Sequence, residues 1–106
     1  MAWILVFFAG LFEVVWAYYM KQSSGFTRLW PTVITLVTMI VSFVLLSLAM
    51  RTLPLGTAYA VWTGIGAVGA FVVGVIAFGE STDFTRVLAA GLIVCGLVLL
   101  RLSPAQ

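Results

Sequence analysis

A single carboxyl group, that of Glu13, stands inside the first apolar segment of this chain. The residues from Phe8 to Tyr18 are otherwise uncharged, and no Lys or Arg lies between Met1 and Lys21 to pair with it. An ionisable side chain at bilayer depth costs roughly 2.5 to 3.5 kcal/mol on insertion scales, and such residues usually mark ion or proton pathways. Glu13 is therefore the candidate binding group for a proton or a cation.

Polar, aromatic and small residues recur at helical spacing in three segments. Residues three and four positions apart share one face of a helix, so each set forms a stripe. The stripes comprise Gly10, Glu13, Trp16 and Ala17; Thr35, Thr38 and Ser42; and Tyr59, Trp62, Thr63 and Gly66. Packed together, they would form a cavity with one carboxylate, hydroxyl and indole donors, and aromatic faces for a cation.

Within this cavity, Gly10 is expected to leave room opposite the acid, and Ser42 with an indole N–H to hold the carboxyl in place. Simpler interpretations stay open for several residues. Tyr59 suits the membrane interface equally well, and Thr35 and Thr38 are expected to bond back to their own backbone carbonyls. The cavity prediction therefore depends mainly on the acid and the two deeper tryptophans.

The composition predicts the helices that must position these groups. Of 106 residues, 64% are hydrophobic, and the charges separate uncharged runs at 29–50 and 52–79 that exceed the roughly 20 residues needed to cross a bilayer. The first segment spans if Glu13 lies inside it, and residues 87–100 span if Arg86 and Arg101 snorkel. We predict an all-α membrane protein, one domain over residues 1–106, with transmembrane helices at about 2–20, 30–50, 57–78 and 85–101. Thr82 or Asp83 is expected to cap the last helix.

Several function classes are poorly supported by the composition. A net charge of +2 is too sparse for nucleic-acid binding. The first helix carries Glu13 and no early Lys or Arg, so it is expected to be retained and not cleaved as a signal peptide. Cys95 is the only cysteine and there is no His, so no disulfide, metal site or cofactor is expected. An intramembrane enzyme would need a second catalytic group, which the apolar segments lack.

The distribution of the basic residues favours neither orientation of the chain in the membrane. Arg51 and Arg101 fall on the side of the termini, and Lys21, Arg28 and Arg86 on the other, a count of two against three. Lys and Arg in short loops set the topology of a membrane protein. A count this nearly equal on the two sides therefore predicts dual topology, with copies inserted in both directions. Four short helices cannot enclose a pathway alone, which predicts an antiparallel dimer.

Small residues offer places for close helix approach and for bending. Gly91 and Gly96 in the last helix suit a contact between copies, although packing within one chain is an equal alternative. Gly64 and Gly66 are more often packing residues, yet two glycines so close in mid-helix also lower the resistance to bending.

The chain resembles the small multidrug resistance family of four-helix bacterial inner-membrane exporters. The resemblance covers essentially the whole chain, and its most specific part is the run Pro54-Leu55-Gly56-Thr57-Ala58-Tyr59-Ala60-Val61-Trp62-Thr63-Gly64-Ile65-Gly66. With Trp16 three residues after Glu13, the sequence is similar to the guanidinium-exporter subtype.

This resemblance implies an antiparallel homodimer in the bacterial inner membrane that exchanges protons for guanidinium, or small guanidinyl cations, by alternating access. Glu13 would bind proton and substrate in turn. The implied site lining comprises Gly10, Trp16, Ser42, Tyr59, Trp62 and Thr63, the implied bend Gly64 and Gly66, and the implied dimer face Gly91 and Gly96. Two alternatives remain open, a broad exporter of quaternary ammonium and other lipophilic cations and a non-transporting membrane accessory protein.

Overall fold

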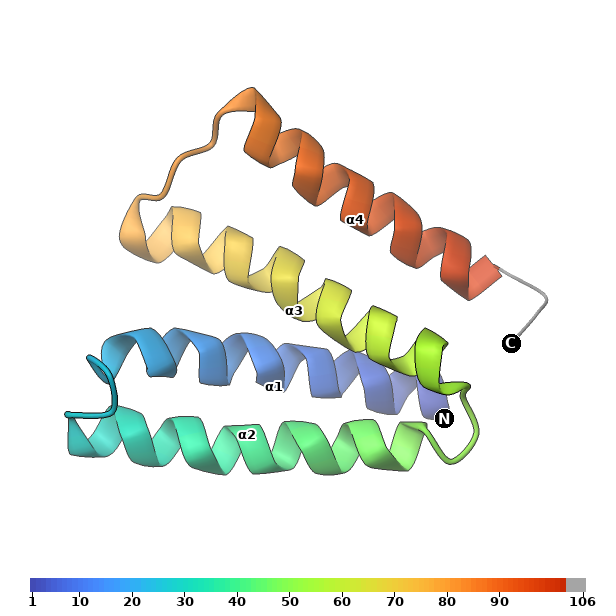
Figure 1. The fold of residues 1–106 in the computed structure, drawn as a ribbon, viewed down its shortest axis with the longest axis horizontal. Helices are drawn as coiled ribbons and strands as arrows, with labels where there is room; N and C mark the ends of the chain where they lie inside the picture. Colours follow the sequence, from blue (N-terminus) through green and yellow to red (C-terminus); the bar gives the residue numbers. More distant parts are fainter. Residues whose placement is uncertain (103–106) are drawn as a thin grey trace.

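The structure, a computed structural model, describes residues 1–102 and contains four α-helices (Figure 1). They are α1 (Ala2–Gln22), α2 (Leu29–Ala49), α3 (Leu55–Phe78) and α4 (Phe84–Leu102). Each is long and apolar enough to cross a membrane, as the lengths of the uncharged runs predict. The prediction of an all-α fold with four transmembrane helices is therefore confirmed.

The helices run alternately up and down and lie side by side in one layer (Figure 1). The backbone extends over 44 × 35 × 16 Å, so the molecule is much thinner in one direction than in the other two. Helix α1 lies between α2 and α3, and α4 packs against α3. The N-terminus lies at the same end of the layer as the C-terminal end of α4 (Figure 1).

Specific turn residues end the first helix. The Ser23 hydroxyl donates to the carbonyl of Met20 (2.6 Å) and accepts the backbone N–H of Phe26 (3.0 Å). These bonds replace helical ones, and the chain then passes through positive φ at Ser24 (50°), Gly25 (72°) and Phe26 (67°). The side chain of Ser23 thus fixes a tight reversal that brings α2 directly against α1.

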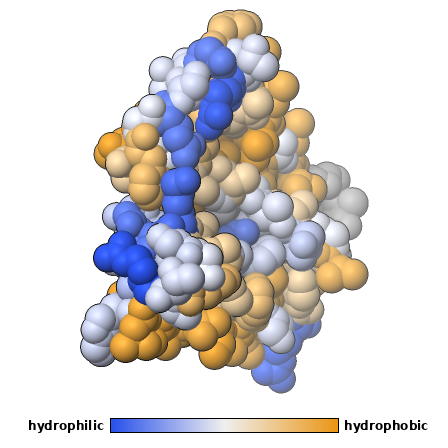
Figure 2. All heavy atoms as spheres, turned by 60° about the vertical axis from the view of Figure 1, so that its left-hand side comes forward, coloured by the Kyte–Doolittle hydropathy of each residue, from blue (hydrophilic) through white to orange (hydrophobic). Residues whose placement is uncertain are grey.

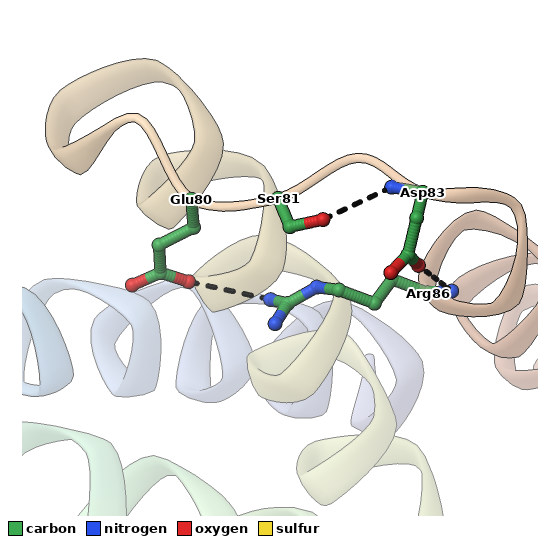
Figure 3. A network of polar contacts seen from close by, with 4 residues as sticks. All are labelled: Glu80, Ser81, Asp83 and Arg86. Carbon is green, nitrogen blue, oxygen red and sulfur yellow. Dashed lines mark hydrogen bonds and ion pairs between the residues drawn. The ribbon is translucent and has the colours of Figure 1, made fainter.

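The α3–α4 connection is held by its own polar residues (Figure 3). Gly79 ends α3 in the left-handed conformation, with φ 65°. The Asp83 carboxylate then accepts the backbone N–H of Arg86 (2.9 Å), which satisfies one of the unpaired donors at the start of α4. Of the two residues predicted as the cap, Asp83 is the one used. Glu80 pairs with Arg86 across the loop, with 3.4 Å between Oε1 and Nη2.

The core lies where α1, α2 and α3 meet. Its buried apolar residues are Val6, Ala9, Leu46, Ala49, Leu53, Ala58, Val61 and Trp62. None of residues 84–102 in α4 is buried. Figure 2, which looks towards the end that carries the α1–α2 and α3–α4 loops, shows hydrophilic residues gathered across that end and hydrophobic ones along the flanks. The flanks are therefore suited to lipid or to other apolar protein.

Candidate functional site

Glu13 lies on α1 with its side chain against α3. Its Oε1 is enclosed and has no hydrogen-bond partner within residues 1–102. A Cβ atom built at Gly66 would overlap Glu13 Oε1 and Cδ, so the carboxyl rests directly on the α3 backbone. A buried polar atom without a partner is uncommon in native structures and calls for an explanation, such as a role in binding.

Trp16 lies one helical turn beyond the acid and presents a second unsatisfied group. Its indole Nε1 is enclosed and has no acceptor among the described residues. The ring packs edge-on against Phe43 of α2, with 6.4 Å between ring centres. A carboxylate acceptor and an indole donor thus lie on one face of α1, and neither is used by the described part of the chain.

Ser42 connects the three core helices. It is fully buried, and its hydroxyl donates to the carbonyl of Ala9 on α1 (2.7 Å) while accepting the indole N–H of Trp62 on α3 (3.0 Å). From the sequence, Ser42 is expected to hold the Glu13 carboxyl. In the structure both hydrogen bonds of Ser42 go elsewhere, and its link to Glu13 is indirect, because the Ala9 carbonyl is also the helical acceptor for the Glu13 backbone N–H.

Aromatic rings form a continuous chain beside this hydrogen-bonded group. Phe43 lies between Trp16 (6.4 Å) and Trp62 (5.8 Å), and Tyr59 packs against Trp62 at 5.5 Å. These distances are typical of aromatic pairs in contact. The structure therefore brings together Trp16, Tyr59 and Trp62, as the polar stripes predict, and Tyr59 keeps 54% of its surface exposed.

Phe43 and the Ala9 carbonyl are members of the site that sequence reasoning missed. Phe43 is one apolar residue in an apolar helix, so its type carries no signal. Ala9 precedes Glu13 by four residues, a spacing that does place it on the same face. Its contribution is a backbone carbonyl, which no residue type can reveal.

Gly10 and Thr63 take different positions from those expected. The open side of Gly10 is filled by Ile65, whose Cγ2 would lie 2.6 Å from a Cβ built there. The room beside the acid comes instead from Gly66 of α3, since a Cβ built there would overlap Glu13 Oε1 and Cδ. Thr63 is exposed and makes none of the contacts described above.

Gly64 packs against α4, and Thr35 and Thr38 form hydrogen bonds within α2. A Cβ at Gly64 would meet the side chain of Leu97 on α4 at 2.7 Å, and α3 is helical without interruption through residues 64–66. Thr35 and Thr38 donate to the carbonyls of Pro31 and Ile34, each at 2.7 Å. The expectation that these threonines bond to their own helix is confirmed.

Gly91 and Gly96 face open space. A Cβ atom built at either position has nothing within 4 Å. Their spacing allowed either a contact between copies or packing within one chain. The structure shows no packing within the chain at these two positions.

A cleft of about 360 Å³ lies between α1 and α3 on the side of the α3–α4 loop. Its lining begins at Val14 and Ala67, which follow Glu13 and Gly66 in the sequence, and extends to Glu80 and Arg86. Two cations flank its outer end: Lys21 Nζ lies 5.4 Å from the centre of the Phe78 ring, and the Arg86 guanidinium 5.3 Å from that of Phe71. The cleft begins beside the carboxyl but does not include it.

Within residues 1–102, no group of three or more His, Cys, Asp or Glu could hold a metal ion. Glu13 is the only carboxylate inside the four helices described, because Glu80 and Asp83 lie in the loop between α3 and α4. The site thus holds one acid, seated against Gly66, with Trp16 one helical turn away on α1. Such an arrangement suits an organic cation or a proton.

Four helices that can cross a membrane, with one carboxyl between α1 and α3, define a small multi-span membrane protein. Residues 1–93 match the family model described as Small Multidrug Resistance protein. The chain belongs to this family. With four spans and bacterial relatives, it is a multi-pass protein of the bacterial inner membrane.

Several curated relatives carry the name guanidinium exporter. The protein from Citrobacter freundii is 59% identical over 103 residues, which cover 97% of this chain and 98% of the relative. The relatives from Salmonella typhimurium strain LT2 and from Yersinia pseudotuberculosis serotype I are 55% and 54% identical over the same length, covering 98% and 99% of the respective relatives. The similarity therefore extends over nearly the whole of each chain.

Proposed function

We propose that this protein exports guanidinium in exchange for protons, and that Glu13 binds the two in turn. The observation that carries the proposal is the enclosed Glu13 Oε1, which accepts no hydrogen bond from residues 1–102. The names of relatives that are 54–59% identical over nearly the full length support guanidinium as the cation.

The chemistry of guanidinium matches the groups at this site. Guanidinium is planar and permanently charged, and it can bond a carboxylate through two parallel N–H groups, as arginine does. The aromatic chain beside Glu13, which includes Trp16 and Trp62, offers ring faces to a cation. A hydrated sodium ion cannot reproduce the forked geometry, so the site favours a flat organic cation.

Coupling to protons follows from competition for one carboxyl. A protonated Glu13 has no charge and cannot form an ion pair with guanidinium, whereas a bound guanidinium excludes the proton. Exchange then needs no long-range relay between separate sites. Two copies of Glu13 in a dimer would allow up to two protons for each monovalent cation.

The proposed assembly is an antiparallel homodimer. One chain forms a layer 16 Å thick, too thin to surround a substrate, so a second copy is needed to close the site. Helix α4 supports this role because none of residues 84–102 is buried and a Cβ at Gly91 or Gly96 would meet nothing within 4 Å. Copies inserted in opposite directions could pair through these faces.

Alternating access would use a bend of α3 at Gly64 and Gly66. Gly64 packs against Leu97 of α4 and Gly66 against Glu13 of α1. A change of the α3 backbone between these two residues would therefore alter the contact with α4 and the surroundings of the carboxyl together.

Transport into proteoliposomes under an imposed pH gradient tests the proposal. Guanidinium is expected to drive proton movement, whereas urea, which is uncharged, and tetraalkylammonium, which lacks N–H donors, are not. Glu13→Gln should abolish guanidinium transport and substrate-induced proton release. Coupled transport retained in that variant would refute the site, and preferred transport of tetraalkylammonium would favour a broad exporter of lipophilic cations.

A further inference from the structure

We infer that Gly66 is a positioning residue for the Glu13 carboxyl. Because glycine has no side chain, position 66 of α3 leaves the space in which the carboxyl lies when it binds the cation. The inference rests on the proposed function, because it gives Gly66 a role in cation binding. It differs from a role in bending, which concerns the flexibility of α3 and not the space beside the acid.

The contact at Gly66 is made with the acid itself. A Cβ built there would overlap Oε1 and Cδ of Glu13 and lie 2.8 Å from its Cγ, and these are the three nearest atoms. Real Cβ atoms essentially never come this close to other heavy atoms. Any residue other than glycine at position 66 therefore requires the carboxyl or one of the two helix backbones to move.

The helix backbones are held in place on either side of this contact. Ile65 fills the space beside Gly10, and Val14 fills the space beside Gly69. Moving α1 away from α3 would open gaps at both of these positions, which costs packing contacts in both helices. The carboxyl of Glu13 is thus the part that gives way when a side chain is added at position 66.

Displacing the carboxyl matters because its present position encloses Oε1 against α3. A cation can then approach only from the side on which the carboxyl is still accessible. A displacement of about 1 Å at a positioned group costs up to about 100-fold in activity. Gly66 would therefore set both the position of the acid and the side from which guanidinium reaches it.

The test compares three glycine-to-alanine variants of the full-length protein in α3. Gly66→Ala adds a methyl group at the carboxyl, Gly64→Ala adds one against Leu97, and Gly69→Ala adds one against Val14 of the same α1–α3 interface. All three raise helix propensity equally, because each replaces Gly by Ala. The pair Gly64→Ala and Gly66→Ala separates stiffening of α3 from displacement of the acid.

Guanidinium affinity, followed by tryptophan fluorescence across a range of pH, is the main readout. Gly66→Ala is expected to weaken binding by about tenfold or more and to shift the pH at which binding is lost. Gly69→Ala, at the same α1–α3 interface but against Val14, should retain the wild-type pH dependence. Gly64→Ala, which tests stiffening of α3, should lose less affinity than Gly66→Ala. Wild-type binding by Gly66→Ala, or an equal loss in Gly64→Ala, would overturn the inference.

Shortening the acid provides the rescue. Asp is one methylene shorter than Glu, so Glu13→Asp combined with Gly66→Ala should bind guanidinium more tightly than Gly66→Ala alone. If Gly66→Ala does not fold, Glu13→Ala combined with Gly66→Ala should restore folding, since truncation removes all three overlapping atoms. Failure of both combinations would contradict the inference.

A readout that needs no transported cation separates this inference from the proposed function. Hydrophobic carbodiimides react with carboxyl groups in apolar surroundings, and mass spectrometry measures the rate at Glu13. Gly66→Ala should change this rate, and Gly69→Ala should leave it close to wild type. If the wild-type protein did not move guanidinium, the proposed function would fail while the labelling result still decided the role of Gly66. An unchanged rate in Gly66→Ala would count against that role.

Discussion

Glu13 and Trp16 require different hydrogen-bond partners. The carboxylate oxygen is an acceptor and the indole Nε1 is a donor only, and neither has a partner within residues 1–102. Guanidinium has N–H donors and no acceptor, so it can satisfy the carboxylate but not the indole. The Trp16 N–H is left for water or for a carboxylate oxygen, and its contribution to the cation is its ring face.

The pH dependence of substrate binding is one prediction at this scale. Protonation neutralises Glu13, so guanidinium affinity should fall as pH falls, by about tenfold for each pH unit where one proton competes and by about a hundredfold where two do. Titration calorimetry at several pH values measures the slope. A dissociation constant that stays constant from acid to alkaline pH would contradict competition at this carboxyl.

Ser42 allows a second prediction about single residues. Ser42→Ala removes the hydrogen bond to Ala9 and leaves the Trp62 Nε1 without its acceptor. Interhelical hydrogen bonds in membranes contribute roughly 0.6 to 2 kcal/mol, so we expect a loss of stability of about that size and a weaker affinity for guanidinium. Ser47→Ala, at an exposed position of the same helix, is the control and should change neither. Equal stability in denaturant unfolding and equal guanidinium affinity of the two variants would exclude a role of Ser42 in linking α1 and α3.

At the scale of the helices, α3 is the central element of the site. Its glycines receive side chains from both neighbours, Glu13 and Val14 from α1 and Leu97 from α4. Close approach without side chains is the usual basis of helix association in membranes, where the surrounding lipid removes the hydrophobic driving force. The same small residues that hold the fold together therefore also determine the space around the acid.

Helix α4 permits a prediction about assembly. Gly96→Leu adds bulk to a face that is open within one chain, so the isolated fold should tolerate it. If the face meets a second copy, the dimer dissociation constant should rise by about tenfold or more, which corresponds to roughly 1.4 kcal/mol. Gly56→Leu, which also adds bulk at an open position but on α3, is the matched control. Förster transfer between labelled copies in lipid measures the dimer dissociation constant of each variant. An unchanged constant in Gly96→Leu would show that Gly96 does not lie in the interface.

At the scale of the whole molecule, the single layer of helices leaves the site incomplete. Trp16 and Tyr59 are not buried, and the core of α1, α2 and α3 lies in a layer 16 Å thick. Glu13 also keeps part of its side chain exposed, although its Oε1 is enclosed. Lipid is a poor partner for a carboxylate, because it offers no hydrogen bonds in the hydrocarbon region. A second copy facing this layer would exclude lipid and enclose the cation.

Orientation in the membrane is the prediction for the whole molecule. Loop charges are nearly even between the two sides, so copies should insert in both directions in comparable numbers. In a Cys95→Ser background, single cysteines at Thr52 and at Thr82 mark opposite ends of the layer, and both positions are exposed. An impermeant thiol reagent added outside intact cells should label about half of each population. Labelling at only one of the two positions would show a single topology and exclude an antiparallel dimer of this chain.

The number of helices and the identity of the central acid could be predicted from the amino-acid sequence. Uncharged runs of sufficient length allow few other arrangements in lipid, because every backbone polar group there must be satisfied within the helix. Glu13 is conspicuous for the same reason, since a lone carboxyl in an apolar run needs a functional explanation. The back-bonding of Thr35 and Thr38 was also predictable, because it depends only on local helix geometry.

Which residues lie next to the acid could not be predicted in this way, because it depends on how the helices pack. Periodicity defines the faces of one helix, but the contact between two helices also depends on their rotation and relative depth, which no single segment encodes. For this reason Gly66 and not Gly10 provides the room beside Glu13, and Ser42 bonds Ala9 and Trp62 and not the carboxyl. Phe43 joins the aromatic chain for the same reason: its neighbours come from two other helices, and their positions exist only once the helices have packed.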